Sequence, residues 1–202
     1  MRSPGGAVLL VALLWAGRSG AQQYDLRTFS LEEGLPSASV NATCEDREGF
    51  LWVATDQGLA RSQGSRFEPF GEQQGAPAAE ATALLAASTA LSDGIVWTGY
   101  RDGTVAAWCK GKFTTLSLNE PLPDHPVRAL LAGPDNTFWL ASRGGGVWQV
   151  DTNAMRSTAF NTGLPTLRVN ALVDLGEGVL LAGTDSGLFR LHMDRWSPVA
   201  EE

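Results

Sequence analysis

The stretch from Phe50 to Leu59, FLWVATDQGL, recurs three more times along the chain. Its counterparts are IVWTGYRDGT at 95–104, TFWLASRGGG at 137–146 and VLLAGTDSGL at 179–188. The residues at the third position of the four copies, 45, 42 and 42 residues apart, are Trp52, Trp97, Trp139 and Leu181. A glycine follows six residues after each of them. Four matches of both pattern and spacing indicate an internal structural repeat.

Each repeat predicts four short strands, A to D. In the first repeat these are expected at 40–45, 50–55, 59–62 and 66–70, separated by turns rich in Gly and Asp. Strand B is apolar at successive positions, which is typical of a strand covered on both faces. Blades arranged around an axis cover each other in this way. We therefore expect an all-β protein of β-propeller blades, built as four four-stranded antiparallel sheets. Turn signals every 8–12 residues exclude a helical solenoid.

The repeat also sets the expected boundaries. The blades should span about 40–70, 81–116, 127–160 and 169–199, with proline-containing links between them. A further segment at 25–30 resembles a strand D, but no set of strands A to C remains for it to join. This orphan strand predicts an open or partial propeller, a fragment of a larger ring rather than a closed and independently stable one.

Residues 1–21 are expected to be a signal peptide. Arg2 is followed by a ten-residue apolar run at 7–16 and by small residues up to Ala21. A membrane anchor is the alternative, but ten apolar residues are about half of what a spanning helix needs. The mature chain would then run from 22 to 202 as one propeller-repeat domain, periplasmic or secreted and not embedded in a membrane.

The composition narrows the choice of partner and cofactor. The mature chain carries 13 basic and 22 acidic residues, and this acidity disfavours nucleic acid and anionic lipid. Cys44 and Cys109 are the two cysteines. Export permits a disulfide between them, but two small apolar strand residues are the favoured interpretation. Because no metal-ligand spacing occurs, we expect neither a metal site nor a cofactor.

The repeat resembles a known family. The pattern D-x-x-G-x-L-W-V-A-T-x-x-G-L-x-R at 46–61, preceded by Gly34-Leu-Pro36 and Val40, is similar to the two-component regulator propeller repeat. The resemblance covers about residues 24–199, although Leu181 replaces the tryptophan in the last repeat. It implies the periplasmic sensor region of a hybrid two-component sensor protein, a class that often detects polysaccharide fragments. Such receptors continue with more blades, a transmembrane helix and a kinase, so a partial receptor is expected here.

Catalytic motifs are missing from the sequence. The histidines, His125 in a link and His192 at the end of a strand, lie far apart, and no G-x-S-x-G nucleophile motif occurs. The acidic pairs Asp46/Glu48 and Asp174/Glu177 belong in or beside A–B turns, where turn formation accounts for them. We therefore predict a binding protein and not an enzyme.

The predicted ligand-binding residues follow from propeller geometry. The B–C turns and the D–A links emerge on one face, around the central channel. Mixed Arg, Asp and Tyr side chains there suit an oligosaccharide or another small polar ligand. The candidates are Asp56, Tyr100, Arg101, Asp102, Arg143 and Asp185.

Two other functions stay open at this point. A propeller scaffold would bind another protein, a receptor or further blades, through an exposed face or edge. A propeller enzyme resembling a streptogramin lyase would need a histidine and metal-binding carboxylates on one face, which two scattered histidines make a poor fit.

Overall fold

The computed structural model describes residues 27–86, 94–176 and 178–199. The predicted signal peptide at 1–21 therefore lies outside the described residues. In the described part, sixteen strands form four four-stranded antiparallel sheets, which confirms the predicted all-β fold class. The first sheet contains β1 (Val40–Glu45), β2 (Leu51–Thr55), β3 (Gly58–Gln63) and β4 (Arg66–Phe70); the second contains β5 (Ala81–Ala86), β6 (Val96–Tyr100), β7 (Val105–Cys109) and β8 (Lys112–Thr115). The third contains β9 (Val127–Ala132), β10 (Thr137–Ser142), β11 (Gly146–Asp151) and β12 (Arg156–Ala159); the fourth contains β13 (Val169–Asp174), β14 (Leu180–Thr184), β15 (Gly187–His192) and β16 (Arg195–Pro198).

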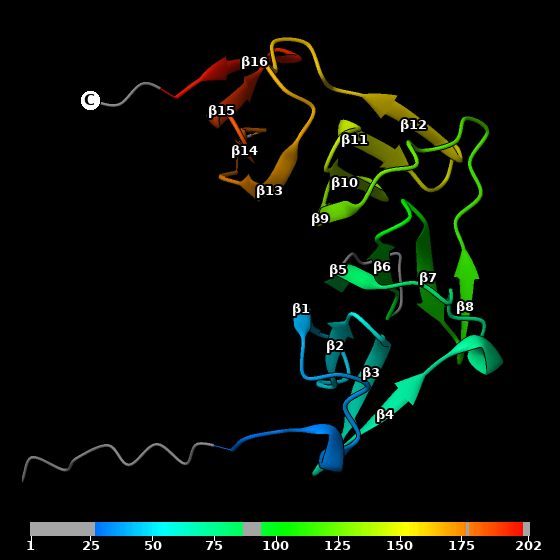
Figure 1. Cartoon of the computed structure of the whole chain (residues 1–202). Helices are drawn as coiled ribbons and strands as arrows, with labels where there is room; N and C mark the ends of the chain where they lie inside the picture. The colour runs from blue at the N-terminus through cyan, green and yellow to red at the C-terminus, as the bar shows by residue number, and fades with distance from the viewer. Residues whose placement is uncertain (1–26, 87–93, 177, 200–202) are drawn as a thin grey trace, which may run out of the picture.

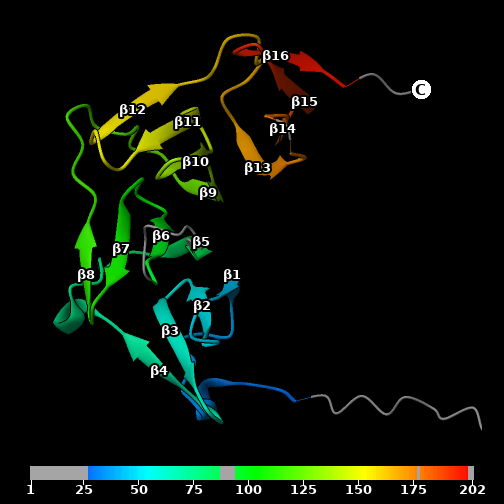
Figure 2. The same ribbon diagram turned by 180° about the vertical axis from the view of Figure 1, so that it is seen from behind.

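The four sheets, blades 1 to 4, are arranged as an open arc. Within each blade the strands are neighbours in chain order, so each blade is a simple meander. The first strands β1, β5, β9 and β13 line the concave side, and the last strands lie on the outside (Figure 1). Seen from behind, the same arc is open between blade 1 and blade 4 (Figure 2). The prediction of an open or partial propeller is thus confirmed.

Three hydrophobic clusters hold neighbouring blades together. One lies between blades 1 and 2, one between blades 2 and 3, and one between blades 3 and 4. Trp52, Trp97 and Trp139 each enter one of them and are at most 9% exposed, so the repeated tryptophan is a core residue between blades. Leu181, the counterpart in blade 4, is only half-buried because no described blade follows it.

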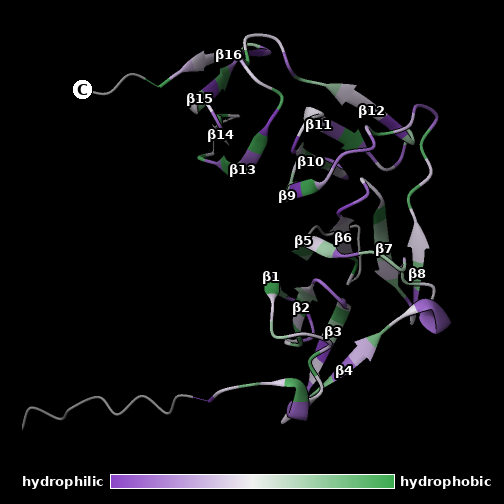
Figure 3. Ribbon diagram, in the orientation of Figure 1, coloured by the Kyte–Doolittle hydropathy of each residue, from purple (hydrophilic) through white to green (hydrophobic). Residues whose placement is uncertain are grey.

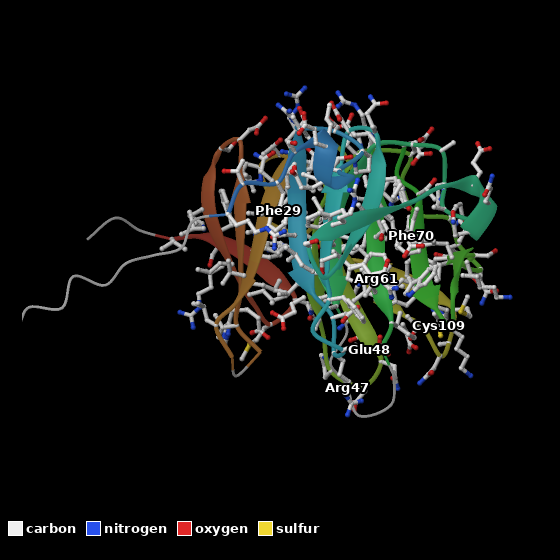
Figure 4. The ribbon with its side chains drawn as sticks, turned by 90° about the horizontal axis from the view of Figure 1, so that it is seen from below. Phe29, Arg47, Glu48, Arg61, Phe70 and Cys109 are labelled. Atoms are coloured by element: carbon white, nitrogen blue, oxygen red, sulfur yellow. The ribbon has the colours of Figure 1, made fainter. Side chains whose placement is uncertain are left out.

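A cation also lies in the first interface. The guanidinium carbon of Arg61 in β3 is 4.6 Å from the Phe50 ring centroid and 5.6 Å from that of Phe70. Trp52 and Trp108 lie 5.5 and 6.0 Å away. Arg61 Nε is buried without a hydrogen-bond partner among the described residues. The aromatic faces therefore compensate this charge by cation–π attraction (Figure 4).

The predicted orphan strand at 25–30 is not a strand in its described part. Residues 27–30 are irregular, and 25 and 26 lie outside the described residues. A strand exists only when its backbone groups pair, and each strand C of the four blades is already paired with its own strand D. The segment is nevertheless held in place. Phe29 packs edge-to-face on Phe67 at 5.2 Å between ring centroids, and Arg27 Nη2 donates to the Ser65 carbonyl at 3.1 Å.

The only helices among the described residues are two short 3-10 turns. They are η1 (Leu31–Glu33) and η2 (Glu72–Gln74), and Figure 3 shows η2 as hydrophilic along its length. No helix in the described ranges is long and apolar enough to cross a membrane.

Cys44 and Cys109 are free thiols, partly buried in β1 and β7. Burial raises the pKa of the Cys44 thiol to about 11.

Candidate ligand-binding face

The B–C turns and the D–A links form one face of the arc. Backbone hydrogen bonds join them: Arg101 N donates to Glu80 O at 2.9 Å, Gly144 N to Leu167 O at 3.0 Å and Asp185 N to Arg168 O at 3.2 Å. The A–B turns lie at the opposite ends of the blades, and in Figure 4 Arg47 and Glu48 mark that side. The expected grouping of turns and links on one face is therefore present.

Two cavities on this face repeat from blade to blade. In blade 1 a cavity of about 410 Å³ lies between the B–C turn and the outgoing link, with Asp56, Glu72 and Glu80 in its lining. In blade 2 a cavity of about 300 Å³ lies in the corresponding place, with Asp102 and Asp124 in its lining. Both volumes are within the size range of small-ligand sites. Their carboxylates offer hydrogen-bond acceptors and disfavour anionic ligands.

Asp56 lines the first of these cavities, and Arg101 is the partner of Glu80, another residue of its lining. Asp56 Oδ1 is buried and has no hydrogen-bond partner among the described residues. Arg101 pairs with Glu80 through a 2.7 Å contact between Nη1 and Oε2. The charge of Arg101 is therefore already balanced. Asp56 Oδ1 is shielded from solvent, and an acceptor is costly to bury without a donor. Asp56 as a whole is only half-buried and lines the cavity.

Asp102 is both a cavity residue and a turn residue. Its Oδ1 accepts a hydrogen bond from Thr104 N at 2.9 Å, which closes the B–C turn of blade 2. Substitution of Asp102 would therefore disturb the turn as well as the cavity. This double role makes it a poorer probe of ligand binding than Asp56.

Arg143 and Asp185 come together at the junction of blades 3 and 4. Asn170 Nδ2 donates to Asp185 Oδ1 at 2.7 Å, and Arg168 Nη1 lies 3.5 Å from Asp185 Oδ2. The hydrogen bond from Asn170 lowers the pKa of Asp185, and the positive charges of Arg168 and Arg143 act in the same direction. The result is an exposed polar cluster with two guanidinium groups and one ionised carboxylate.

Tyr100 does not belong to the exposed set. Its side chain is fully buried in the cluster between blades 1 and 2. The prediction of an accessible aromatic surface at Tyr100 is therefore wrong. The side chains of successive strand residues alternate between the two faces, so the last residue of β6 points to blade 1 and away from solvent.

Sequence reasoning missed three residues on this face: Glu80, Arg168 and Asn170. A signal for Asn170 exists, because the Val-Asn-Ala triplet occurs at both 40–42 and 169–171. The two asparagines nevertheless act differently. Asn41 Nδ2 donates across the interface to Ala81 O of blade 2 at 2.9 Å. Asn170 is in the last described blade and bonds to Asp185 instead.

The comparisons with known proteins agree with this architecture. Residues 34–57 match the family model described as two component regulator propeller, which confirms the expected resemblance for this repeat. No curated protein matches the chain in sequence. Solved structures do match in fold.

Two of the similar structures come from B. thetaiotaomicron. The extracellular domain of BT3049, described as a hybrid two component system, has a TM-score of 0.74 and 18% identity, covering 86% of this chain and 26% of that one. The extracellular domain of BT4673, described as a one component system, has a TM-score of 0.67 and 16% identity, covering 80% and 22%. The chain thus spans about a quarter of the length of these structures.

A third similar structure is an enzyme. Virginiamycin B lyase from Staphylococcus aureus has a TM-score of 0.64 and 13% identity, covering 83% of this chain and 58% of the lyase. At these identities the likeness shows the fold alone, and it does not separate binding from catalysis. The chain is a β-propeller domain similar to the extracellular domains of two-component systems.

Proposed function

We propose that this chain is a periplasmic ligand-sensing propeller module that binds a neutral, hydroxyl-rich ligand and does not catalyse a reaction. The observation that carries the proposal is the repeated cavity between B–C turn and outgoing link, lined by Asp56 in blade 1 and Asp102 in blade 2. Hydroxyl groups donate well to carboxylates, and the half-buried Asp56 contributes a carboxylate residue to the lining of the blade 1 cavity.

The placement of the histidines supports binding over lyase-type catalysis. The His125 ring lies against Gly144 on the candidate face, whereas His192 ends β15 at the opposite face. No group of three or more His, Cys, Asp or Glu side chains suited to a metal ion occurs within the ranges that the structure describes. A histidine and a metal would both be required on one face for the lyase alternative.

Binding can be tested with the purified mature chain. We expect neutral oligosaccharides to raise its melting temperature and Asp56→Asn to weaken the binding, measured by calorimetry, by about 10-fold or more, because the lost hydrogen bond involves a charged acceptor. The matched control is Glu48→Gln, which removes one exposed carboxylate charge from the opposite face.

Each other outcome counts against the proposal. If no oligosaccharide stabilises the chain, or if Glu48→Gln weakens binding as much as Asp56→Asn, the assigned face is wrong. If Mg²⁺ alone stabilises the chain and Asp56→Asn abolishes that effect, a metal-dependent lyase becomes the better interpretation.

A further inference from the structure

The three interfaces between blades are built from equivalent parts. In each interface the side chains of strands A to C of one blade, the end of its strand D and its outgoing link pack on the next blade. Between blades 1 and 2 these parts include Trp52, Phe70 of strand D and Ala76 of the link, against Val96 and Phe113. If an interface contains only some of these parts, the parts that it lacks therefore indicate which strands of a neighbouring blade are absent.

The N-terminal segment, residues 27–36, supplies the outermost parts of a fourth interface. Phe29 and Leu35 pack on Val53, Ala60 and Phe67 of blade 1. In the repeat, Phe29 corresponds to Phe70 and Leu35 to Ala76. The 3-10 turns η1 and η2 follow Phe29 and Phe70, and both end at glycines with positive φ. In each turn the N-cap backbone N–H donates to the side chain three residues later, Ser30 to Glu33 and Gly71 to Gln74.

A glycine of the N-terminal segment and glycines of the links between blades lie at equivalent positions on the neighbouring blade. A Cβ on Gly75 would lie 2.9 Å from the carbonyl oxygen of Phe113, and a Cβ on Gly163 would overlap that of Trp196. A Cβ on Gly34 would likewise overlap the carbonyl oxygen of Phe67. In all three cases the link passes directly over strand D of the next blade. The N-terminal segment is therefore positioned as the strand D and link of a preceding blade.

The inner part of that fourth interface, on the face of blade 1, is exposed to solvent. Val40 is 48% exposed, whereas its counterparts in blades 2 to 4 are at most 1% exposed: Ala81, Val127 and Val169. Leu51 is 37% exposed, whereas its counterparts are at most 4% exposed: Val96, Phe138 and Leu180. In the other blades these positions are covered by strands A to C of the preceding blade.

We propose that blade 1 and the N-terminal segment together bind a three-stranded propeller unit of a partner chain, one that has strands A to C but no strand D. Residues 27–30 would pair with its strand C as the fourth strand, a form of β-strand addition. A second copy of this chain is a poor occupant, because β4, β8, β12 and β16 already pair with every strand C described here. This assembly surface is separate from the proposed ligand site.

The test uses two acceptors that supply such a unit. One is the chain lengthened after Val199 by a second copy of residues 162–192, and the other is the chain ending at His192, which lacks β16. Each is mixed with the unaltered chain, and the complex is followed by light scattering and by amide hydrogen exchange at residues 28–30. We expect a complex in which these amides exchange at least about 100-fold more slowly than in the unaltered chain alone.

Two matched variants of the unaltered chain complete the test. Phe29→Asp, which places a charge in the contact with Phe67, should abolish the protection at 28–30 with both acceptors. Leu31→Asp, at a position that is 60% exposed in the same segment, should leave it unchanged. The proposal is overturned if neither acceptor produces a complex and protection, or if both persist in Phe29→Asp.

Discussion

At the scale of single residues, the end of strand B shows how one position takes two roles. Thr55 Oγ1 and Thr184 Oγ1 donate to the carbonyls of Gly58 and Gly187, at 2.8 and 2.9 Å, and so close their B–C turns. In blade 2 the same position holds Tyr100, whose ring fills the interface with blade 1. The sequence placed Tyr100 beside a turn correctly, but the turn does not reveal which blade the side chain faces.

Tyr100 makes the stability of the fold sensitive to alkaline pH. Burial raises the pKa of its phenol well above the usual 10, and the charge of Asp102 acts in the same direction. Above pH 10 the unfolded chain releases this proton while the folded chain keeps it, so stability present below pH 10 is lost as pH rises. We expect Tyr100→Phe to reduce the loss of unfolding free energy between pH 9 and 11, measured by urea denaturation.

Cys44 titrates in the same range but is present in both proteins, so their difference isolates Tyr100. At pH 7 the variant should be as stable as the original chain or more so by about 1 kcal/mol, because Tyr100 Oη is buried without a partner among the described residues. Parallel pH profiles for the two proteins would contradict the buried position of the phenol.

At the scale of elements, the strands of each blade could be predicted because the repeat occurs four times and each turn carries its own Gly or Asp signal. The charged B–C turn residues could be placed on one face for the same reason. The segment at 27–30 could not be predicted correctly, because its residues favour a strand but strand formation requires a partner that the described blades do not offer. The pairing of Arg101 with Glu80 was also hidden, since it depends on how a link folds over a turn.

Gly163 of the link between blades 3 and 4 and Gly176 of the A–B turn of blade 4 allow a test of how closely a link packs on a blade. Gly163 and Gly176 have similar positive φ values, 92° and 84°, so Ala carries a comparable backbone cost of about 1 kcal/mol at each. Only at Gly163 would a Cβ overlap backbone, the carbonyl of Trp196, whereas Gly176 has no atom within 4 Å. We expect Gly163→Ala to lower the unfolding free energy by about 2–4 kcal/mol and Gly176→Ala by about 1 kcal/mol.

Denaturant titrations of the two variants measure the difference. Equal effects would show that the link can move away from strand D at little cost. In that case the contact of Gly34 with Phe67 would no longer support the inference of a preceding blade.

At the scale of the whole molecule, the two ends of the arc differ from its interior. Leu188 of blade 4 is 45% exposed, whereas its counterparts Leu59, Val105 and Val147 are at most 2% exposed beneath the next blade. Val173 and Val199 of blade 4 are also exposed, at 49% and 42%. The blade 4 face is thus composed like an interface but has no described neighbour.

An apolar face of this kind predicts self-association of the isolated mature chain. We expect size-exclusion chromatography with light scattering to show a mass that rises with protein concentration. Leu188→Lys should reduce this rise, because a charge on the face must lose its hydration when the face is covered. The matched control is Leu175→Lys, at a position that is 61% exposed between β13 and β14. It adds the same charge outside the face and should have a smaller effect.

The opposite outcome is a sharp monomer with a cooperative melt at all concentrations. It would show that four blades are sufficient for a stable fold in water, and the description of the chain as a fragment of a larger ring would then be wrong.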